Sequence, residues 1–143
     1  MNEDQILLYM TADYKISRYF RGIFAFDELP MVLEQGIYIV NTDSKYGRGK
    51  HWVVLSRTTN SRNIDYFDSL AGACIPYVLK LISKNNLKCV INTKRLQSLS
   101  SDVCGDYCIM FAFFACRGYS INEFVQMFTH NYSHNDNMVC LAK

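Results

Sequence analysis

The sequence is poor in proline and carries no strong excess of charge of either sign. Its two prolines, Pro30 and Pro76, stand far apart, and the chain shows no internal repeat, low-complexity tract or linker. These absences argue against a repeat protein and against a disordered chain. A net charge of +2 likewise gives no strong basic bias. With half of its 143 residues hydrophobic, the chain is predicted to fold as a single domain over residues 1–143.

The sequence also lacks a recognisable signal peptide and a regular cysteine spacing. Residues 2–5 are polar and acidic, whereas a secretory signal would be basic and then apolar. We therefore expect a protein that is not secreted. The cysteines are irregularly spaced and are expected to be mostly free thiols, because no secretory context supports a disulfide framework. They are Cys74, Cys89, Cys104, Cys108, Cys116 and Cys140.

Short apolar runs separated by polar turns predict an α+β fold. Two of these runs, 51–55 and 64–68, are expected to form a β-hairpin, because a turn-like polar segment separates them. Such a hairpin brings His51 and Asp68 to the same end. A polar, glycine-containing loop over 43–49 is expected to lie directly before His51.

A second feature is the apolar segment that follows Cys104. It is hydrophobic nearly all round and is predicted to be a central, buried helix over 104–118, with Ser101 or Asp102 as its N-cap. The fold class we predict is a small mixed sheet packed against this helix. The other expected elements are helices over 4–10, 76–85 and 120–130 and strands over 37–40 and 88–92.

Cys104 is the candidate nucleophile of this chain. A cysteine at a helix start feels the positive end of the helix dipole and the unpaired N–H groups of the first turn. That environment lowers the pKa of a thiol and favours the reactive thiolate. Cys108 and Cys116 lie inside the apolar segment, where cysteine behaves as a small hydrophobic residue.

Three residues upstream of Cys104 complete a set for acyl transfer. His51 would take the thiol proton and later protonate the leaving amine, and Asp68 would orient the imidazole. Gln97, together with the Cys104 backbone N–H, would stabilise the oxyanion. Trp52, the only tryptophan, would support His51 by covering the imidazole, although an aromatic residue in a strand is most often part of the core. This chemistry needs no metal.

These residues resemble the catalytic set of a known family. His51-Trp52, Asp68, Gln97 and Cys104-Gly105 occur in the chain order of the adenovirus-type endopeptidases (adenain) and the related proteases of Maverick/Polinton elements. That family shares a clan with the SUMO-specific proteases. Asp68-Ser69 departs from the Glu-Pro of adenain and is similar to the SUMO-protease branch. The resemblance spans roughly residues 5 to 118 and includes the stretches 19–22 and 39–42.

The resemblance implies a papain-like cysteine protease fold with permuted chain order. The implied activity is a cysteine endopeptidase that processes viral or virus-like-element structural precursor proteins at Gly-containing sites. An activating viral peptide and DNA are the implied cofactors, and Cys89 lies near the family's cysteine that forms a disulfide with that peptide. The resemblance implies a monomeric protein that is located in the host cytoplasm or nucleus, or within virus particles. It implies no membrane partner.

Other functions are compatible with the same residues. Removal of SUMO or ubiquitin-like modifiers by isopeptidase chemistry would use the same triad, because those modifiers end in Gly-Gly. A zinc-binding module is a candidate from another class, since Cys104-x3-Cys108 and His130-x3-His134 superficially resemble a zinc finger. The segment between the two pairs is long and apolar, which argues against it. A protease fold kept only for binding, without catalysis, is the remaining alternative.

Overall fold

The computed structural model describes residues 1–47 and 51–142 and has an α+β fold built on a five-stranded mixed sheet. The strand order follows the sequence, with parallel pairing at both edges, between β1 and β2 and between β4 and β5, and antiparallel pairing between the central strands. The strands are β1 Phe20–Ala25, β2 Gly36–Asn41, β3 Trp52–Arg57, β4 Asn63–Phe67 and β5 Lys88–Ile91. The predicted hairpin is therefore confirmed as the antiparallel pair β3–β4.

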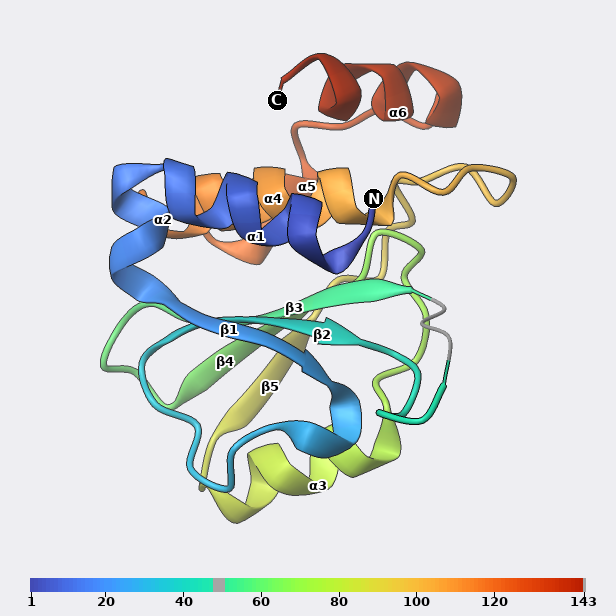
Figure 1. Ribbon diagram of the computed structural model, residues 1–143. Helices are drawn as coiled ribbons and strands as arrows, with labels where there is room; N and C mark the ends of the chain where they lie inside the picture. Colours follow the sequence, from blue (N-terminus) through green and yellow to red (C-terminus); the bar gives the residue numbers. More distant parts are fainter. Residues whose placement is uncertain (48–50, 143) are drawn as a thin grey trace.

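Helices cover both faces of the sheet (Figure 1). One face carries α4 together with α1, α2 and α5, and α3 lies on the opposite face, with α6 on the outer side of the larger helical layer. The sheet is therefore a middle layer whose central strands β2, β3 and β4 are largely buried, while the edge strands β1 and β5 are partly exposed. The helices are α1 Glu3–Ala12, α2 Tyr14–Tyr19, α3 Pro76–Lys84, α4 Cys104–Ala115, α5 Ile121–Val125 and α6 Tyr132–Leu141, with a short 3-10 turn at Phe26–Glu28.

Strand β2 shows why the sheet lies between two layers. Successive side chains of a strand point to opposite faces. In β2, Ile37 and Ile39 join the core under α4, whereas Tyr38 and Val40 join the core under α3, and all four are at most 2% exposed. A strand buried on both faces is apolar without alternation, which is the pattern of the run 36–40.

Helix α4 is the central helix that the sequence predicted, but its N-terminus differs from the expectation. Val103 is the residue at the N-cap position, so the prediction that Ser101 or Asp102 caps the helix was wrong. The valine side chain has no oxygen that can accept a hydrogen bond, so only the Val103 backbone carbonyl accepts there, from the Asp106 N–H at 3.1 Å. Among the described residues, no side chain caps the first turn of α4, and the backbone N–H of Gly105 donates to the Cys104 thiol instead.

The C-terminal part of the chain also differs from the sequence prediction. In place of one helix over 120–130, α5 begins after the capping box of Ser120 and Glu123 and ends at Val125, and α6 follows as a separate helix. Asn135 on α6 is fully buried, and its Nδ2 donates to the Leu96 carbonyl at 3.1 Å. Helix α6 therefore holds the connection that leads to Gln97.

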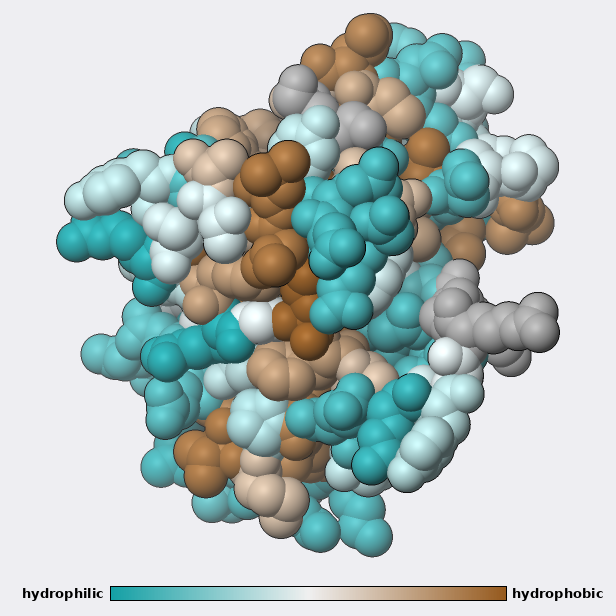
Figure 2. Space-filling model, in the orientation of Figure 1, coloured by the Kyte–Doolittle hydropathy of each residue, from teal (hydrophilic) through white to brown (hydrophobic). Residues whose placement is uncertain are grey.

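Some apolar side chains stay on the surface of the helical layer. Figure 2 shows brown, apolar surface between teal, polar patches on the face that carries α1. Leu7 and Leu8 on α1 are 44% and 67% exposed. Within the described residues, none of the helices has the length and apolar character needed to cross a membrane.

Candidate active site

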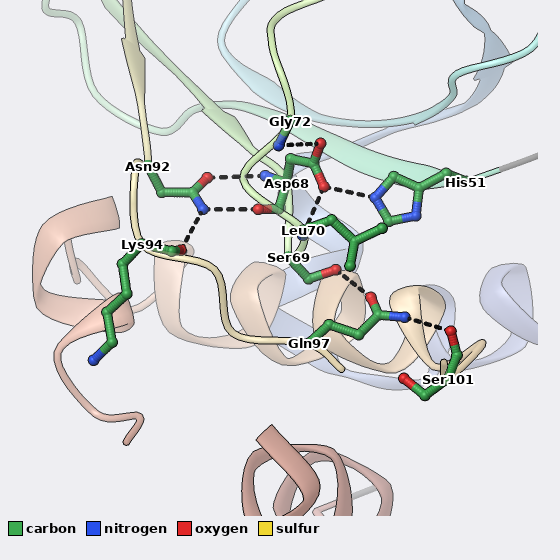
Figure 3. Close-up of polar contacts among 9 residues, drawn as sticks. All are labelled: His51, Asp68, Ser69, Leu70, Gly72, Asn92, Lys94, Gln97 and Ser101. Atoms are coloured by element: carbon green, nitrogen blue, oxygen red, sulfur yellow. Dashed lines mark hydrogen bonds and ion pairs between the residues drawn. The ribbon is translucent and has the colours of Figure 1, made fainter. Parts of the chain in front are cut away.

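His51 and Asp68 meet at one end of the β3–β4 hairpin. His51 lies directly before β3, and Asp68 directly after β4. The His51 Nε2 and Asp68 Oδ1 atoms are 2.6 Å apart, with side chains 14% and 8% exposed (Figure 3). Because Nε2 contacts the carboxylate, Nδ1 is the ring nitrogen left to exchange a proton with the thiol. Of the expected glycine loop before His51, residues 48 and 49 lie outside the described residues.

The chain folds around the Asp68 carboxylate in a tight turn. The backbone N–H of Leu70 donates to Oδ1 at 2.8 Å, and that of Gly72 donates to Oδ2 at 3.1 Å. Ala71 between them adopts a left-handed backbone conformation, with φ of 52°. Burial alone would raise the pKa of Asp68, but the contact with His51 and these two N–H groups outweigh it and lower the pKa. The carboxylate therefore stays ionised and fixed.

Cys104 lies at the first position of α4 and is 9% exposed. Burial would raise the pKa of its thiol, but the hydrogen bond with His51 outweighs burial, with help from the backbone N–H groups of Trp52 and Gly105. The net result is a pKa below the usual value for cysteine. The arrangement favours a thiolate, as the position at the helix start predicts.

The His51 imidazole is held in its charged form by two partners. Burial alone would lower the pKa of His51, but the hydrogen bond to Asp68 and the contact with the Cys104 thiol outweigh it and raise the pKa to about 9. The lowered Cys104 pKa and the raised His51 pKa both favour a thiolate–imidazolium pair. Such a pair is the reactive state of a cysteine nucleophile with a histidine partner.

Gln97 lies beside this pair on the connection between β5 and α4. Its side chain is buried, its Oε1 accepts from the Ser69 hydroxyl at 2.6 Å, and its Nε2 donates to the Ser101 carbonyl at 3.0 Å (Figure 3). The amide nitrogen has two hydrogens, so one remains for a ligand. Gln97, His51 and Cys104 line the same cleft of about 780 Å³.

Trp52 and Gly105 form contacts between the cleft and the start of the chain. The Trp52 indole Nε1 donates to the Met1 carbonyl at 3.3 Å, and Trp52 lines the cleft next to His51. A Cβ atom at position 105 would lie 3.1 Å from the Met1 Cβ and 3.4 Å from the Ile6 Cδ1. Glycine thus permits the close approach of residues 1–6 to the first turn of α4.

Asn92 and Ser69 belong to the site but were not among the functional residues predicted from the sequence. Asn92 is 5% exposed; its Oδ1 accepts from the Asp68 N–H at 2.9 Å and its Nδ2 donates to the Asp68 carbonyl at 2.7 Å (Figure 3). The signal available in the sequence was a polar residue at the end of a strand, at 92, and a serine directly after the candidate acid. Neither the asparagine nor the serine reveals its hydrogen-bond partner in the sequence, because that partner is distant in the chain.

The remaining sequence candidates lie outside this cleft or are spread over the structure. Cys89 lies on β5 with its thiol in contact with that of Cys74, and both are partly buried free thiols. Cys108 is buried in α4, whereas His134 is exposed on α6. Among residues 1–47 and 51–142, no group of three or more His, Cys, Asp or Glu side chains is arranged to hold a metal ion.

Comparisons with known proteins give a structural match but none from sequence. No family model matches this chain, and no curated protein matches it. The crystal structure of the selenomethionine form of the ASFV pS273R protease is similar, with a TM-score of 0.52 and 19% sequence identity. The chain shares the fold of that protease. The match covers 72% of this chain and 43% of the pS273R chain, so this chain spans less than half the length of its structural neighbour.

Proposed function

We propose that this protein is a cysteine endopeptidase. The observation that carries the proposal is the arrangement in one cleft of a low-pKa thiol at a helix start, an imidazole 2.6 Å from a buried carboxylate, and a buried glutamine amide. The fold likeness to a protease agrees with it. Cys104, His51 and Asp68 form the proposed triad, and Gln97 is the proposed oxyanion donor.

The first half-reaction makes an acyl-enzyme. The Cys104 thiolate attacks the scissile carbonyl carbon, a C–S bond forms, and the carbonyl oxygen becomes an oxyanion. The Gln97 amide and the Cys104 backbone N–H donate to that oxygen; one such donor is typically worth about 3 kcal/mol of transition-state stabilisation. When the C–N bond breaks, the His51 imidazolium gives its proton to the leaving amine, and a thioester remains.

The second half-reaction hydrolyses the thioester. The neutral His51 imidazole takes a proton from water, and the hydroxide attacks the thioester carbonyl. The C–S bond then breaks, and the products are a carboxylic acid and the Cys104 thiolate with its imidazolium partner. Asp68 remains ionised throughout and stabilises the imidazolium each time that it forms.

The family resemblance extends this proposal to substrates and to the type of fold. We assign the chain to the adenain-like proteases, with a papain-like fold of permuted chain order, acting on viral or virus-like-element structural precursors at Gly-containing sites. An activating peptide and DNA are proposed cofactors. The contact between Cys89 and Cys74 means that a peptide thiol would compete with Cys74 for a disulfide at Cys89.

Isopeptidase action on a ubiquitin-like modifier is the second candidate function. The observation that favours it is Asp68-Ser69, which is similar to the SUMO-protease branch and whose serine contacts Gln97. Incubation with a SUMO conjugate and with a precursor-type Gly-Gly peptide separates the two functions, since an endopeptidase cleaves the peptide and leaves the modifier conjugate intact.

Thiol alkylation at pH 6 tests the proposal directly. We expect iodoacetamide to label Cys104 well before the exposed Cys140 in the wild-type protein, as read site by site by mass spectrometry, and this preference to disappear in His51→Ala. Cys104→Ala should abolish cleavage of Gly-Gly peptides, whereas Cys140→Ala, the matched control, should leave cleavage unchanged. Equal labelling of Cys104 and Cys140, also in the presence of DNA and candidate activating peptides, would refute the proposal.

A further inference from the structure

Ser69 and Gln97 form a buried polar pair, and Gln97 of this pair lines the cleft. The two residues are each 1% exposed, and the Ser69 hydroxyl donates to Gln97 Oε1 at 2.6 Å. The Ser69 carbonyl also accepts from the backbone N–H groups of Leu96 and Gln97, at 2.9 and 3.0 Å. Ser69 therefore fixes both the backbone and the side chain of Gln97.

The contacts of the Gln97 amide determine which way it faces. Its nitrogen donates to the Ser101 carbonyl, which can only accept, so a flipped amide would bring two oxygens together. With Oε1 held by Ser69 on one side and Nε2 by Ser101 on the other, the second N–H hydrogen has one direction left. Figure 3 shows the amide between these two serines.

We propose that Ser69 is a positioning residue for the oxyanion hole, whose hydroxyl holds the Gln97 amide so that its free N–H hydrogen faces the carbonyl oxygen of the substrate. This inference rests on the proposed function, because it concerns the same reaction. Ser69 does not touch the reacting atoms; it acts through Gln97. Since Ser69 directly follows Asp68, a single turn of the chain fixes both the orienting carboxylate and the oxyanion donor.

Alkylation and peptide hydrolysis both use the Cys104 thiolate but differ in whether they need the oxyanion donors. Alkylation by iodoacetamide displaces iodide at a saturated carbon and forms no oxyanion, so it reports on the Cys104 thiolate alone. Hydrolysis of a peptide amide needs the thiolate and the oxyanion donors together. A residue that acts through Gln97 changes the second reaction without changing the first.

The experiment compares Ser69→Ala, Gln97→Ala and the double variant with the wild type. The probes are iodoacetamide and a fluorogenic peptide ending in a Gly-Gly coumarin amide. We expect kcat to fall about 100-fold in Gln97→Ala and about tenfold in Ser69→Ala, with KM nearly constant and Cys104 alkylation within about twofold of the wild type. In the double variant, the loss should equal that of Gln97→Ala alone, because Ser69 then has no amide to hold.

Ser100→Ala is the matched control, since Ser100 is an exposed serine on the same connection as Gln97, and it should keep wild-type kcat. Ser69→Cys, which retains a weak donor and the size of the side chain, covers the case in which Ser69→Ala does not fold, and its kcat should lie between those of wild type and Gln97→Ala. Equal losses of alkylation and hydrolysis in a folded Ser69 variant, or losses that multiply in the double variant, would overturn the proposal.

The failure of this inference is distinguishable from the failure of the proposed function. A wild-type protein that hydrolyses the peptide and is unaffected by Ser69→Ala and Ser69→Cys overturns only the role of Ser69. A wild-type protein that neither hydrolyses the peptide nor shows preferential alkylation of Cys104 overturns the proposed function, and the role of Ser69 with it.

Discussion

Asn92 holds the backbone of Asp68 from both sides, accepting from its N–H and donating to its carbonyl. Because this pair is buried, Asn92→Ala leaves two polar backbone groups without that partner. We expect the free energy of unfolding to fall by about 1–3 kcal/mol, measured by urea denaturation, and peptide cleavage to fall because Asp68 shifts away from His51. Asn60→Ala, at an exposed turn position, is the control and should change stability by less than about 0.5 kcal/mol. A similar small change in Asn92→Ala would contradict this account.

The pH dependence of cleavage follows from the Cys104 and His51 pKa values. The reactive pair needs Cys104 deprotonated and His51 protonated, so kcat/KM should rise with pH through the lowered pKa of Cys104 and fall as pH passes the His51 pKa of about 9. In Asp68→Asn the hydrogen bond that chiefly raises the His51 pKa is weakened, so the alkaline limb should move to lower pH. His134→Ala, at an exposed histidine, should leave the profile unchanged. An alkaline limb at the same pH in Asp68→Asn would show that Asp68 does not set the His51 pKa.

Gly72 lies close to the Asp68 carboxylate. A Cβ atom at position 72 would lie 2.9 Å from Asp68 Oδ2, closer than a carbon and an oxygen pack in proteins. Gly72→Ala should therefore displace the carboxylate and lower kcat by about tenfold, a loss on the order of 1.4 kcal/mol in transition-state stabilisation. The neighbouring Ala71→Gly is the control: its left-handed backbone suits glycine, so activity should be retained and stability should stay within about 1 kcal/mol of wild type. Full activity in Gly72→Ala would argue against a fixed carboxylate position.

Asn135 connects α6 to the segment that carries Gln97. Its Nδ2 donates to the carbonyls of Leu96 and Thr129, and its Oδ1 accepts from the Thr129 N–H. We expect Asn135→Ala to lower the free energy of unfolding by about 1–3 kcal/mol and to lower kcat, while Cys104 alkylation stays near the wild-type rate. Asn137→Ala on the exposed side of α6 should have neither effect. Loss of stability with unchanged kcat would restrict Asn135 to a purely structural role.

The parts of the fold that the sequence predicted well depend on local patterns. The β3–β4 hairpin follows from two apolar runs and the polar turn between them, and helix α4 from its long apolar segment. The meeting of His51 and Asp68 then follows from the hairpin alone, because both residues border the paired strands. The predicted strands at 37–40 and 88–92 and the helix beginning at Pro76 lie within one residue of β2, β5 and α3.

The parts that the sequence did not predict depend on long-range contacts. Helix α2, the parallel pairing of β1 with β2, and α6 were not anticipated. Asp13 and Asn131 cap the two helices, but helices this short depend mainly on packing against the rest of the fold. The contact of Ser69 with Gln97 joins residues 28 positions apart, and that of Asn92 with Asp68 joins residues 24 apart. Hydrogen bonds between residues so far apart are set by the tertiary fold, so no fixed spacing in the sequence predicts them.

The attachment of α6 to the segment before Gln97 has a consequence for the protein during its synthesis. His51 and Asp68 leave the ribosome first, Gln97 and Cys104 follow, and the Asn135 side chain that holds Leu96 emerges after all of them. A growing chain that contains all four proposed catalytic residues therefore still lacks the helix that holds the oxyanion donor in place. If the protein has the proposed activity, this order of elements along the chain would delay a complete active site until translation has passed α6.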